Sequence, residues 1–213
     1  MLKLVIANKN YSSWSMRAWV LMRQAGIDFE EIQLMLGKDT KVIGIERYSA
    51  AGKAPVLLID GASVWDTLAI AETLAERFPQ KRLWPEDPAI RRLARSACVE
   101  MHSGFQALRG NLPMNIRASL PDRDMNPDVQ REIDRILALW RTCRASKKGP
   151  GDLLFDHFTI ADAFFAPVAM RFTTYGIALP DAAADYVTAI QNLSAVREWC
   201  DAARRETAFI GGG

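Results

Sequence analysis

The sequence is poor in the residues from which disulfide frameworks and metal centres are built. Its 213 residues include only three cysteines, Cys98, Cys143 and Cys200, and no CxxC pair. Its two histidines, His102 and His157, lie far apart in the chain. An odd number of widely spaced cysteines argues against a disulfide framework, and so few ligands argue against a zinc site. We therefore expect no metal centre.

Long apolar runs and an excess of one charge are also missing. The opening apolar run, Leu2 to Ala7, is too short for the core of a signal peptide, and no stretch approaches the ~18 apolar residues that a membrane span needs. Lysine and arginine total 27 against 25 acidic residues, a formal net charge of +2. This balance gives no electrostatic reason to expect a nucleic acid or an anionic membrane as partner. We expect a cytoplasmic protein.

The first eighty residues alternate short apolar segments with segments of helical spacing. Strands are predicted over 2–7, 29–34, 55–60 and 63–65, and helices over 15–25 and 68–78. A further, variable helical stretch is expected between the second and third strands. Gly26 and Pro79 supply the stop signals of the two well-defined helices. The order β-α-β-α-β-β-α predicts an α/β fold, a small mixed sheet covered by helices.

Beyond residue 79 the pattern changes to helices alone. Residues 79–88 hold three prolines and many charges and are predicted to form a linker. Apolar residues then recur at spacings of three and four from Ala94 to Leu112, which predicts one long helix. Further helices are predicted around 133–140 and over 158–172, 181–190 and 194–204, and 211–213 is expected to be a frayed end. The chain thus divides into an α/β domain, 1–80, and an all-α domain, 88–213.

Three local features of the α/β half carry polar groups that can bind a ligand. The first is the run Ser12-Ser13-Trp14-Ser15, between the first strand and the first helix. Hydroxyls at such a position cap the free N–H groups of a helix, and the same helix end attracts anions. The serines are therefore either plain turn and cap residues or part of an anion site.

The other two features are the run Lys53-Ala54-Pro55-Val56 and the pair Asp66-Thr67. Proline cannot donate to a sheet ladder, so Pro55 marks a special junction at the start of a strand. A cis Ala54–Pro55 bond would turn the N–H and C=O of Ala54 outward to pair with an extended peptide, whereas a trans bond at a sheet edge is the commoner arrangement. Asp66 and Thr67 are either helix caps or acceptors of an α-ammonium and holders of an α-carboxylate.

In their order along the chain, these motifs resemble the glutathione transferase superfamily, and the resemblance covers nearly the whole length. In that family a thioredoxin-like domain ends with a cis-proline strand and an acidic-hydroxyl pair, here Ala54-Pro55 and Asp66-Thr67. Residues 83–91 resemble the family's crossing into an all-helical domain, and 158–162 resemble its inner capping box. Ser12 to Ser15 with Arg17 is most similar to the zeta class, which includes maleylacetoacetate isomerases and usually has cysteine in place of Trp14.

The resemblance implies a homodimeric enzyme that uses glutathione as cosubstrate and activates its thiol. Ser12 is the residue expected to contact the glutathione sulfur, with Ser13 and Ser15 as the neighbouring candidates. For the rest of the tripeptide, Ala54 is expected to contact the cysteinyl part, and Val56 continues the strand after Pro55. Asp66 and Thr67 are expected to hold the γ-glutamyl end, and Lys53 is expected near the glycyl carboxylate.

The electrophile is expected between the two domains, beside the predicted long helix. Met101, His102, Phe105 and Arg109 are the candidates for that wall, although Met101 and Phe105 fit a core stripe better and the other two fit an exposed surface. Two other functions fit the same residues: a glutathione-dependent thiol–disulfide oxidoreductase, and a non-catalytic glutathione- or ligand-binding module. Because serine oxygen cannot exchange disulfides, a redox role would have to run through bound glutathione.

Overall fold

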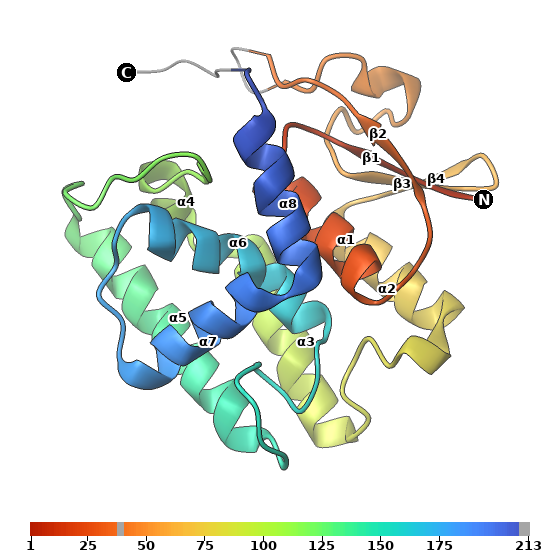
Figure 1. Ribbon diagram of the computed structural model, residues 1–213. Helices are drawn as coiled ribbons and strands as arrows, with labels where there is room; N and C mark the ends of the chain where they lie inside the picture. The colour runs from red at the N-terminus through yellow and green to blue at the C-terminus, as the bar shows by residue number, and fades with distance from the viewer. Residues whose placement is uncertain (38–40, 209–213) are drawn as a thin grey trace.

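The computed structural model of the protein describes residues 1–37 and 41–208. Within this part, a four-stranded sheet with two helices comes first and a bundle of helices follows (Figure 1). The predicted class, an α/β half followed by an all-helical half, is confirmed. The expected frayed end at 211–213 lies outside the described residues. None of the described helices combines the length and the apolar character needed to cross a bilayer.

The sheet is mixed and has the strand order β2-β1-β3-β4. Its strands are β1 (Leu2–Ile6), β2 (Glu30–Gln33), β3 (Val56–Ile59) and β4 (Ala62–Trp65). β1 runs parallel to β2 and antiparallel to β3, and the β3–β4 hairpin turns through Asp60 and Gly61, both at positive φ as a two-residue hairpin turn requires. All four strands were predicted within two residues. The helical stretch expected between β2 and β3 is wrong: its described residues contain only the 3₁₀ turn η1 (Ile45–Arg47).

The sheet is followed and flanked by helices that start at polar caps. Helix α1 (Ser13–Gln24) has Ser12 as its N-cap, and α2 (Thr67–Arg77) has Asp66. A 3₁₀ turn, η2 (Pro79–Lys81), then leads toward the helical half. That half contains α3 (Pro88–Ser103), α4 (Gln106–Asn111), α5 (Pro127–Ser146), α6 (Ile160–Thr174), α7 (Asp181–Asn192) and α8 (Ser194–Arg205).

The prediction of a single long helix from Ala94 to Leu112 is wrong, because the helix is interrupted between α3 and α4. A Cβ on Gly104 would lie 2.8 Å from the Glu100 carbonyl oxygen, and Phe105 takes a left-handed φ of 60°. The Glu132 carboxylate of α5 then accepts the free N–H groups of Ala107 and Leu108 and caps α4 from outside. The apolar side chains on both sides of the break still enter the core.

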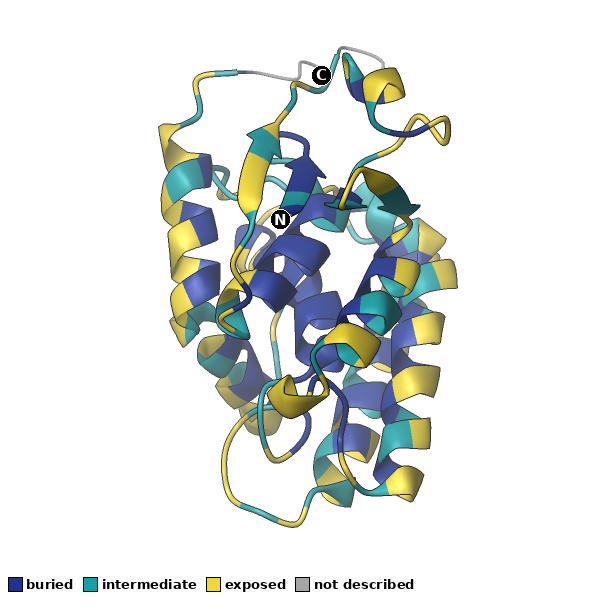
Figure 2. Ribbon diagram, turned by 90° about the vertical axis from the view of Figure 1, so that its right-hand side faces the viewer, coloured by how far each residue is buried: buried dark blue, intermediate teal, exposed yellow. Residues whose placement is uncertain are grey.

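The capping box predicted at the start of α6 is present. The Asp162 carboxylate accepts hydrogen bonds from the N–H and the hydroxyl of Thr159, at 2.9 and 3.1 Å, and from the N–H of Leu154 at 3.1 Å. Burial raises the pKa of this carboxyl to about 6. Helix α6 is buried along almost its whole length and packs against α1, so it joins the two halves. Figure 2 shows buried helices at the centre of the molecule and helices with exposed faces around them.

The end of the described chain returns to the loop after β1. Helix α8 packs beside α1 (Figure 1), and just beyond it the Glu206 carboxylate accepts the backbone N–H groups of Lys9 at 2.6 Å and Asn10 at 3.0 Å. Arg117 donates to the carbonyl oxygens of Glu206 and Ala208. We call these contacts the Glu206 clasp, because they hold the loop that leads into the serine run.

Candidate functional site

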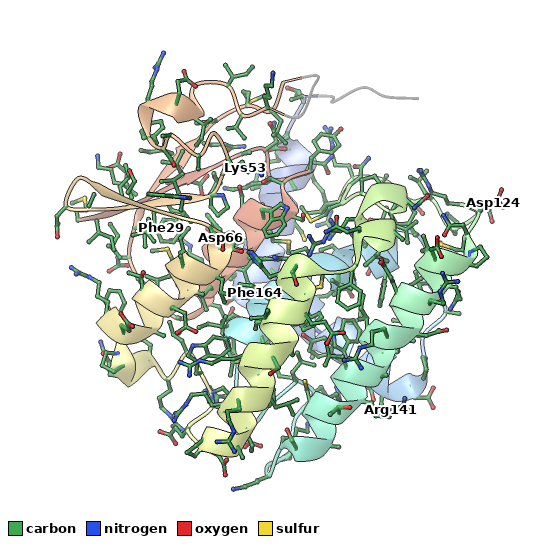
Figure 3. The ribbon with its side chains drawn as sticks, turned by 180° about the vertical axis from the view of Figure 1, so that it is seen from behind. Phe29, Lys53, Asp66, Asp124, Arg141 and Phe164 are labelled. Atoms are coloured by element: carbon green, nitrogen blue, oxygen red, sulfur yellow. The ribbon has the colours of Figure 1, made fainter. Side chains whose placement is uncertain are left out.

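A cleft of about 1120 Å³ opens where the loops of the sheet half face the helical half. In Figure 3, Lys53 and Asp66 lie on the sheet side of this junction, and Phe164 of α6 lies on the helical side. The cleft is lined by Tyr11, Ser12, Ser13, Trp14, Leu36, Val42, Ala51, Gly52, Lys53, Ala54, Pro55, Trp65, Asp66, Thr67, His102, Pro113, Met114, Asn115, Arg117, Ala118, Leu120, Arg123 and Tyr175.

The first turn of α1 places Ser12 and Ser13 on the cleft wall and buries Ser15. The Ser12 oxygen accepts the N–H of Ser15 at 3.3 Å as an N-cap and lies 2.8 Å from the Ser15 oxygen. The Ser15 hydroxyl is fully buried and accepts the N–H of Ala7 at 3.0 Å, so it fastens α1 to the end of β1. Two of the three candidate serines therefore line the cleft, at a helix end that favours negative charge.

Ser13 is held from behind by a buried guanidinium. Arg171 of α6 donates from Nη2 to the Ser13 oxygen at 3.1 Å, from Nε to the Leu112 carbonyl at 2.9 Å and from Nη1 to the Pro167 carbonyl at 3.3 Å. Burial, and then the nearby charge of Arg109, lower the pKa of Arg171 to about 10. The side chain is thus still a cation at neutral pH.

Trp14 covers two more arginines beneath the start of α1. The guanidinium carbon of Arg17 lies 4.3 Å from the centre of the Trp14 ring and that of Arg109 lies 4.9 Å from it, both cation–π distances. Arg17 is buried, and its Nε and Nη1 have no hydrogen-bond partner. Burial, followed by the charges of Arg109 and Arg171, lowers the pKa of Arg17 to about 9. Buried positive charge therefore lies behind the cleft-facing serines.

Asp66 and Thr67 meet the cleft where β4 ends and α2 begins. Asp66 has a left-handed φ of 74°, and its Oδ1 accepts the N–H of Leu68 at 2.8 Å. Thr67 is only 1% exposed, yet its hydroxyl has no hydrogen-bond partner. A buried polar group normally has a partner, so the unpaired Thr67 hydroxyl marks a place where a ligand group fits. The pair offers a carboxylate, a hydroxyl and a helix N-terminus, which suits an ammonium and a carboxylate on one carbon.

Lys53, Ala54 and Pro55 also line the cleft, whereas Val56 begins β3 and is buried between its neighbours in the sheet. The Ala54–Pro55 peptide bond is cis, the arrangement that the family resemblance implied. Lys53 is exposed and places a cation at the rim.

The wall expected from the long helix is only partly present. Met101 and Phe105 are buried in the core, and Arg109 lies behind Trp14, where it donates to the carbonyl oxygens of Met101 and His102. Of the four candidates, His102 lines the cleft. Its Nε2 lies 3.2 Å from Oδ2 of Asp66, its ring meets Trp14 edge-on at 5.1 Å, and burial lowers its pKa.

A further part of the cleft lining comes from residues that the sequence did not predict. They follow α4 or end α6: Pro113, Met114, Arg117, Leu120, Arg123 and Tyr175. The Tyr175 hydroxyl donates to the Pro113 carbonyl at 2.9 Å, and Arg117 lies 3.2 Å from the Tyr11 hydroxyl. None of these residues belongs to a local motif, so only the packing of distant segments reveals them.

The cysteines lie away from this chemistry. All three are buried free thiols, and burial raises the pKa of Cys143 to about 12 and of Cys200 to about 11. Burial also raises the pKa of Cys98 well above its usual range. In the described part of the chain, no group of three or more histidine, cysteine or acidic side chains is placed to hold a metal ion.

Comparison with known families matches both halves of the chain. Residues 11–77 match the model described as glutathione S-transferase, N-terminal domain, and residues 87–202 match the glutathione S-transferase, C-terminal domain. The maleylacetoacetate isomerase of Rattus norvegicus is 35% identical over 125 residues, 57% of this chain and 56% of that protein. The Mus musculus isomerase is 35% identical over 101 residues, 46% of this chain and 47% of that protein. The chain spans about half the length of these relatives.

Solved structures share the fold at low sequence identity. A glutathione transferase homologue from Burkholderia, solved with bound glutathione, has a TM-score of 0.73 at 22% identity and covers 96% of this chain and 99% of its own. A glutathione S-transferase from Methylobacterium radiotolerans, in complex with glutathione sulfonate, has a TM-score of 0.65 at 20% identity, with 93% and 94% covered. Both halves of the fold are therefore found together in other proteins.

Proposed function

The chain belongs to the glutathione S-transferase family, and from that premise we propose that it binds glutathione in the cleft and activates its thiol for attack on an electrophile. The observation that carries this proposal is the unpaired, buried hydroxyl of Thr67 beside the Asp66 carboxylate, both lining the cleft at the start of α2. Glutathione ends in a γ-glutamyl group that carries an ammonium and a carboxylate on one carbon. The pair supplies one partner for each charge.

The remainder of the tripeptide would extend from this point along the cleft. We assign the backbone of Ala54 to the cysteinyl part, with Pro55 and Val56 continuing into β3, and Lys53 to the glycyl carboxylate. Lys53, Ala54 and Pro55 line the same cleft as Ser12 and Ser13. The thiol is thereby assigned to the N-terminus of α1, next to Ser12 and Ser13.

Activation of the thiol is an electrostatic problem. A free thiol has a pKa near ~8.5, so only a few per cent is ionised at neutral pH. A hydroxyl donor and a helix N-terminus that lower this pKa by about two units contribute roughly 2.7 kcal/mol. The buried guanidiniums of Arg17 and Arg171 add positive charge behind the same place. The thiolate then becomes the majority species.

The reaction that we propose is glutathione transfer or a glutathione-dependent isomerisation of the maleylacetoacetate isomerase type. The relatives whose names carry that activity, and the zeta-like serine run, favour the isomerisation. We further propose a glutathione-binding domain, 1–80, a helical domain, 88–213, and a cytoplasmic location, together with the homodimer that the family resemblance implies. A thiol–disulfide oxidoreductase is the second candidate, which mixed-disulfide turnover would reveal.

Substitution of Thr67 by valine tests the binding site most directly. The hydroxyl has no partner in the protein, so Thr67→Val should leave the free energy of unfolding without ligand unchanged or slightly higher. The same variant should weaken glutathione binding several-fold in calorimetry. Thr73→Val, on α2 but outside the cleft lining, is the matched control and should bind like the wild type.

Failure of the wild type to bind would refute the proposal as a whole. If saturating glutathione neither releases heat nor raises the melting temperature of the wild-type protein, the cleft is not a glutathione site. If the wild type binds but Thr67→Val binds equally well, the γ-glutamyl assignment is wrong. An assay with maleylacetoacetate beside a panel of other electrophiles separates isomerisation from transfer.

A further inference from the structure

We propose that Ser13, held in place by Arg171, donates the hydrogen bond that stabilises the glutathione thiolate, while Ser12 serves mainly as the cap of α1. The inference rests on the proposed function. It departs from the role that the family resemblance gives to Ser12. Ser13 would be a catalytic residue, because it touches the reacting sulfur, and Arg171 a positioning residue that acts through Ser13.

The contact with Arg171 makes the Ser13 oxygen an acceptor. A guanidinium can only donate, so the contact of 3.1 Å from Arg171 Nη2 requires the Ser13 oxygen to be the acceptor. The hydroxyl hydrogen is then left for another partner, and Ser13 lines the cleft. An anion in the cleft is the partner that such a hydroxyl favours.

Arg171 is itself held rigidly and carries an uncompensated charge. Its other donors bind the backbone carbonyls of Leu112 and Pro167, which come from two different segments of the helical half. In the part of the chain that the structure describes, no carboxylate forms an ion pair with it. Its charge therefore polarises the Ser13 hydroxyl instead of being cancelled at the guanidinium.

Ser12 differs because its hydroxyl is already engaged within α1. Its oxygen accepts the N–H of Ser15 at 3.3 Å, and the two hydroxyl oxygens are 2.8 Å apart. The Ser15 oxygen in turn accepts from Ala7. The Ser12 hydroxyl donates to the Ser15 oxygen, so its hydrogen is used at the start of α1, and Ser12 has a structural task that Ser13 does not have.

The proposed step balances without any further reactant. The S–H bond of bound glutathione breaks, its electron pair stays on sulfur, and the proton passes to water. The Ser13 hydroxyl keeps its own proton and donates a hydrogen bond to the resulting thiolate. Attack of the sulfur on the electrophile then proceeds from the anion.

The first experiment compares Ser13→Ala with Ser12→Ala. The pKa of bound glutathione is measured from thiolate absorbance against pH, at glutathione concentrations that calorimetry shows to be saturating for each variant. Ser13→Ala should raise this pKa by about one unit. At a pH below both pKa values, the ionised fraction of the thiol would then be tenfold smaller than in the wild type. Ser12→Ala should raise it less and should instead lower the melting temperature by roughly 2–4 °C, as loss of an N-cap does in a chain of this size. An unchanged pKa in Ser13→Ala, or the larger shift in Ser12→Ala, overturns the proposal.

A double-mutant cycle with Arg171→Gln tests the positioning role. If Arg171 acts through Ser13, the Arg171→Gln substitution should raise the pKa of the bound thiol when Ser13 is present. The same substitution should change that pKa almost not at all in the Ser13→Ala background. Equal shifts in both backgrounds would mean that the charge acts on sulfur directly, and they overturn the pairing. Arg171→Lys replaces Arg171→Gln if the latter does not fold. This inference and the proposed function fail in different ways. If the proposed function is wrong, the wild type does not bind glutathione; if only this inference is wrong, the wild type and Ser13→Ala both bind it and the thiol has the same pKa in both.

Discussion

Replacing Asp66 by asparagine isolates the charge in the proposed γ-glutamyl site. Asparagine keeps an acceptor oxygen for the N–H of Leu68 and has nearly the same shape as aspartate, so it changes the packing around the backbone at φ 74° and ψ 137° very little. Alanine would lose the cap and strain the backbone as well, so its effect would mix folding with binding. Asp66→Asn removes the negative charge that faces the ligand's ammonium, and with it the carboxylate that lies 3.2 Å from His102 Nε2.

The magnitude follows from the exposure of the carboxylate. A hydrogen bond to a charged group is worth roughly 1.5–3 kcal/mol, and solvent screening moves a half-exposed group to the lower end. The Asp66 side chain is 45% exposed. We therefore expect Asp66→Asn to weaken glutathione binding by about 1.4 kcal/mol, a tenfold rise in Kd.

Titration calorimetry at neutral pH measures this difference, with Glu76→Gln as the matched control. Glu76 is an exposed acid on the same helix and does not line the cleft, so the control removes one charge from α2 without touching the site. The control should bind like the wild type. Equal Kd values for Asp66→Asn and the wild type would refute the assignment of the ammonium to this carboxylate.

Three further predictions concern stability. Gly104→Ala should lower the free energy of unfolding by about 1–3 kcal/mol because its methyl group would meet the Glu100 carbonyl. Gly110→Ala, on the open face of α4, should not destabilise the protein. If urea unfolding shows Gly110→Ala to be the less stable variant, the backbone turn between α3 and α4 is contradicted. Burial lowers the pKa of His102 against the opposing effect of Asp66, so the unfolded chain binds more protons and the stability of the fold should fall as the pH drops below ~6.5. His102→Gln should therefore make the melting temperature depend less on pH between pH 7 and 5. An unaltered pH dependence would contradict this assignment. Asp162→Ala should cost at least about 2 kcal/mol in denaturant unfolding because three donors lose their acceptor, and a cost below about 1 kcal/mol would be inconsistent with the capping box.

Local sequence patterns were enough to predict most of the elements. The strands follow from short apolar runs, and α1 and α2 from helical spacing with serine and aspartate at their starts. The break at Gly104 escaped prediction because Met101, Phe105 and Leu108 keep helical spacing across it and all three enter the core. Apolar periodicity reports which side chains are buried, and here a turn of backbone preserves that burial.

In the candidate site, too, the local features could be predicted and the contacts between distant segments could not. Ser12, Ser13, Asp66 and Thr67 could be proposed from sequence because caps are local features of the chain. The contact between Ser13 and Arg171 joins residues 158 positions apart, and no local pattern encodes it. His102 was expected as a candidate for the electrophile wall and does line the cleft, but its contacts with Asp66 and Trp14 join distant parts of the chain and could not be predicted from a local pattern.

The Glu206 clasp has a practical consequence for anyone who produces this protein. Shortening the chain ahead of Glu206 would free two amides in the loop before the serine run and release Arg117, so a truncated product should show impaired chemistry even where its core still folds.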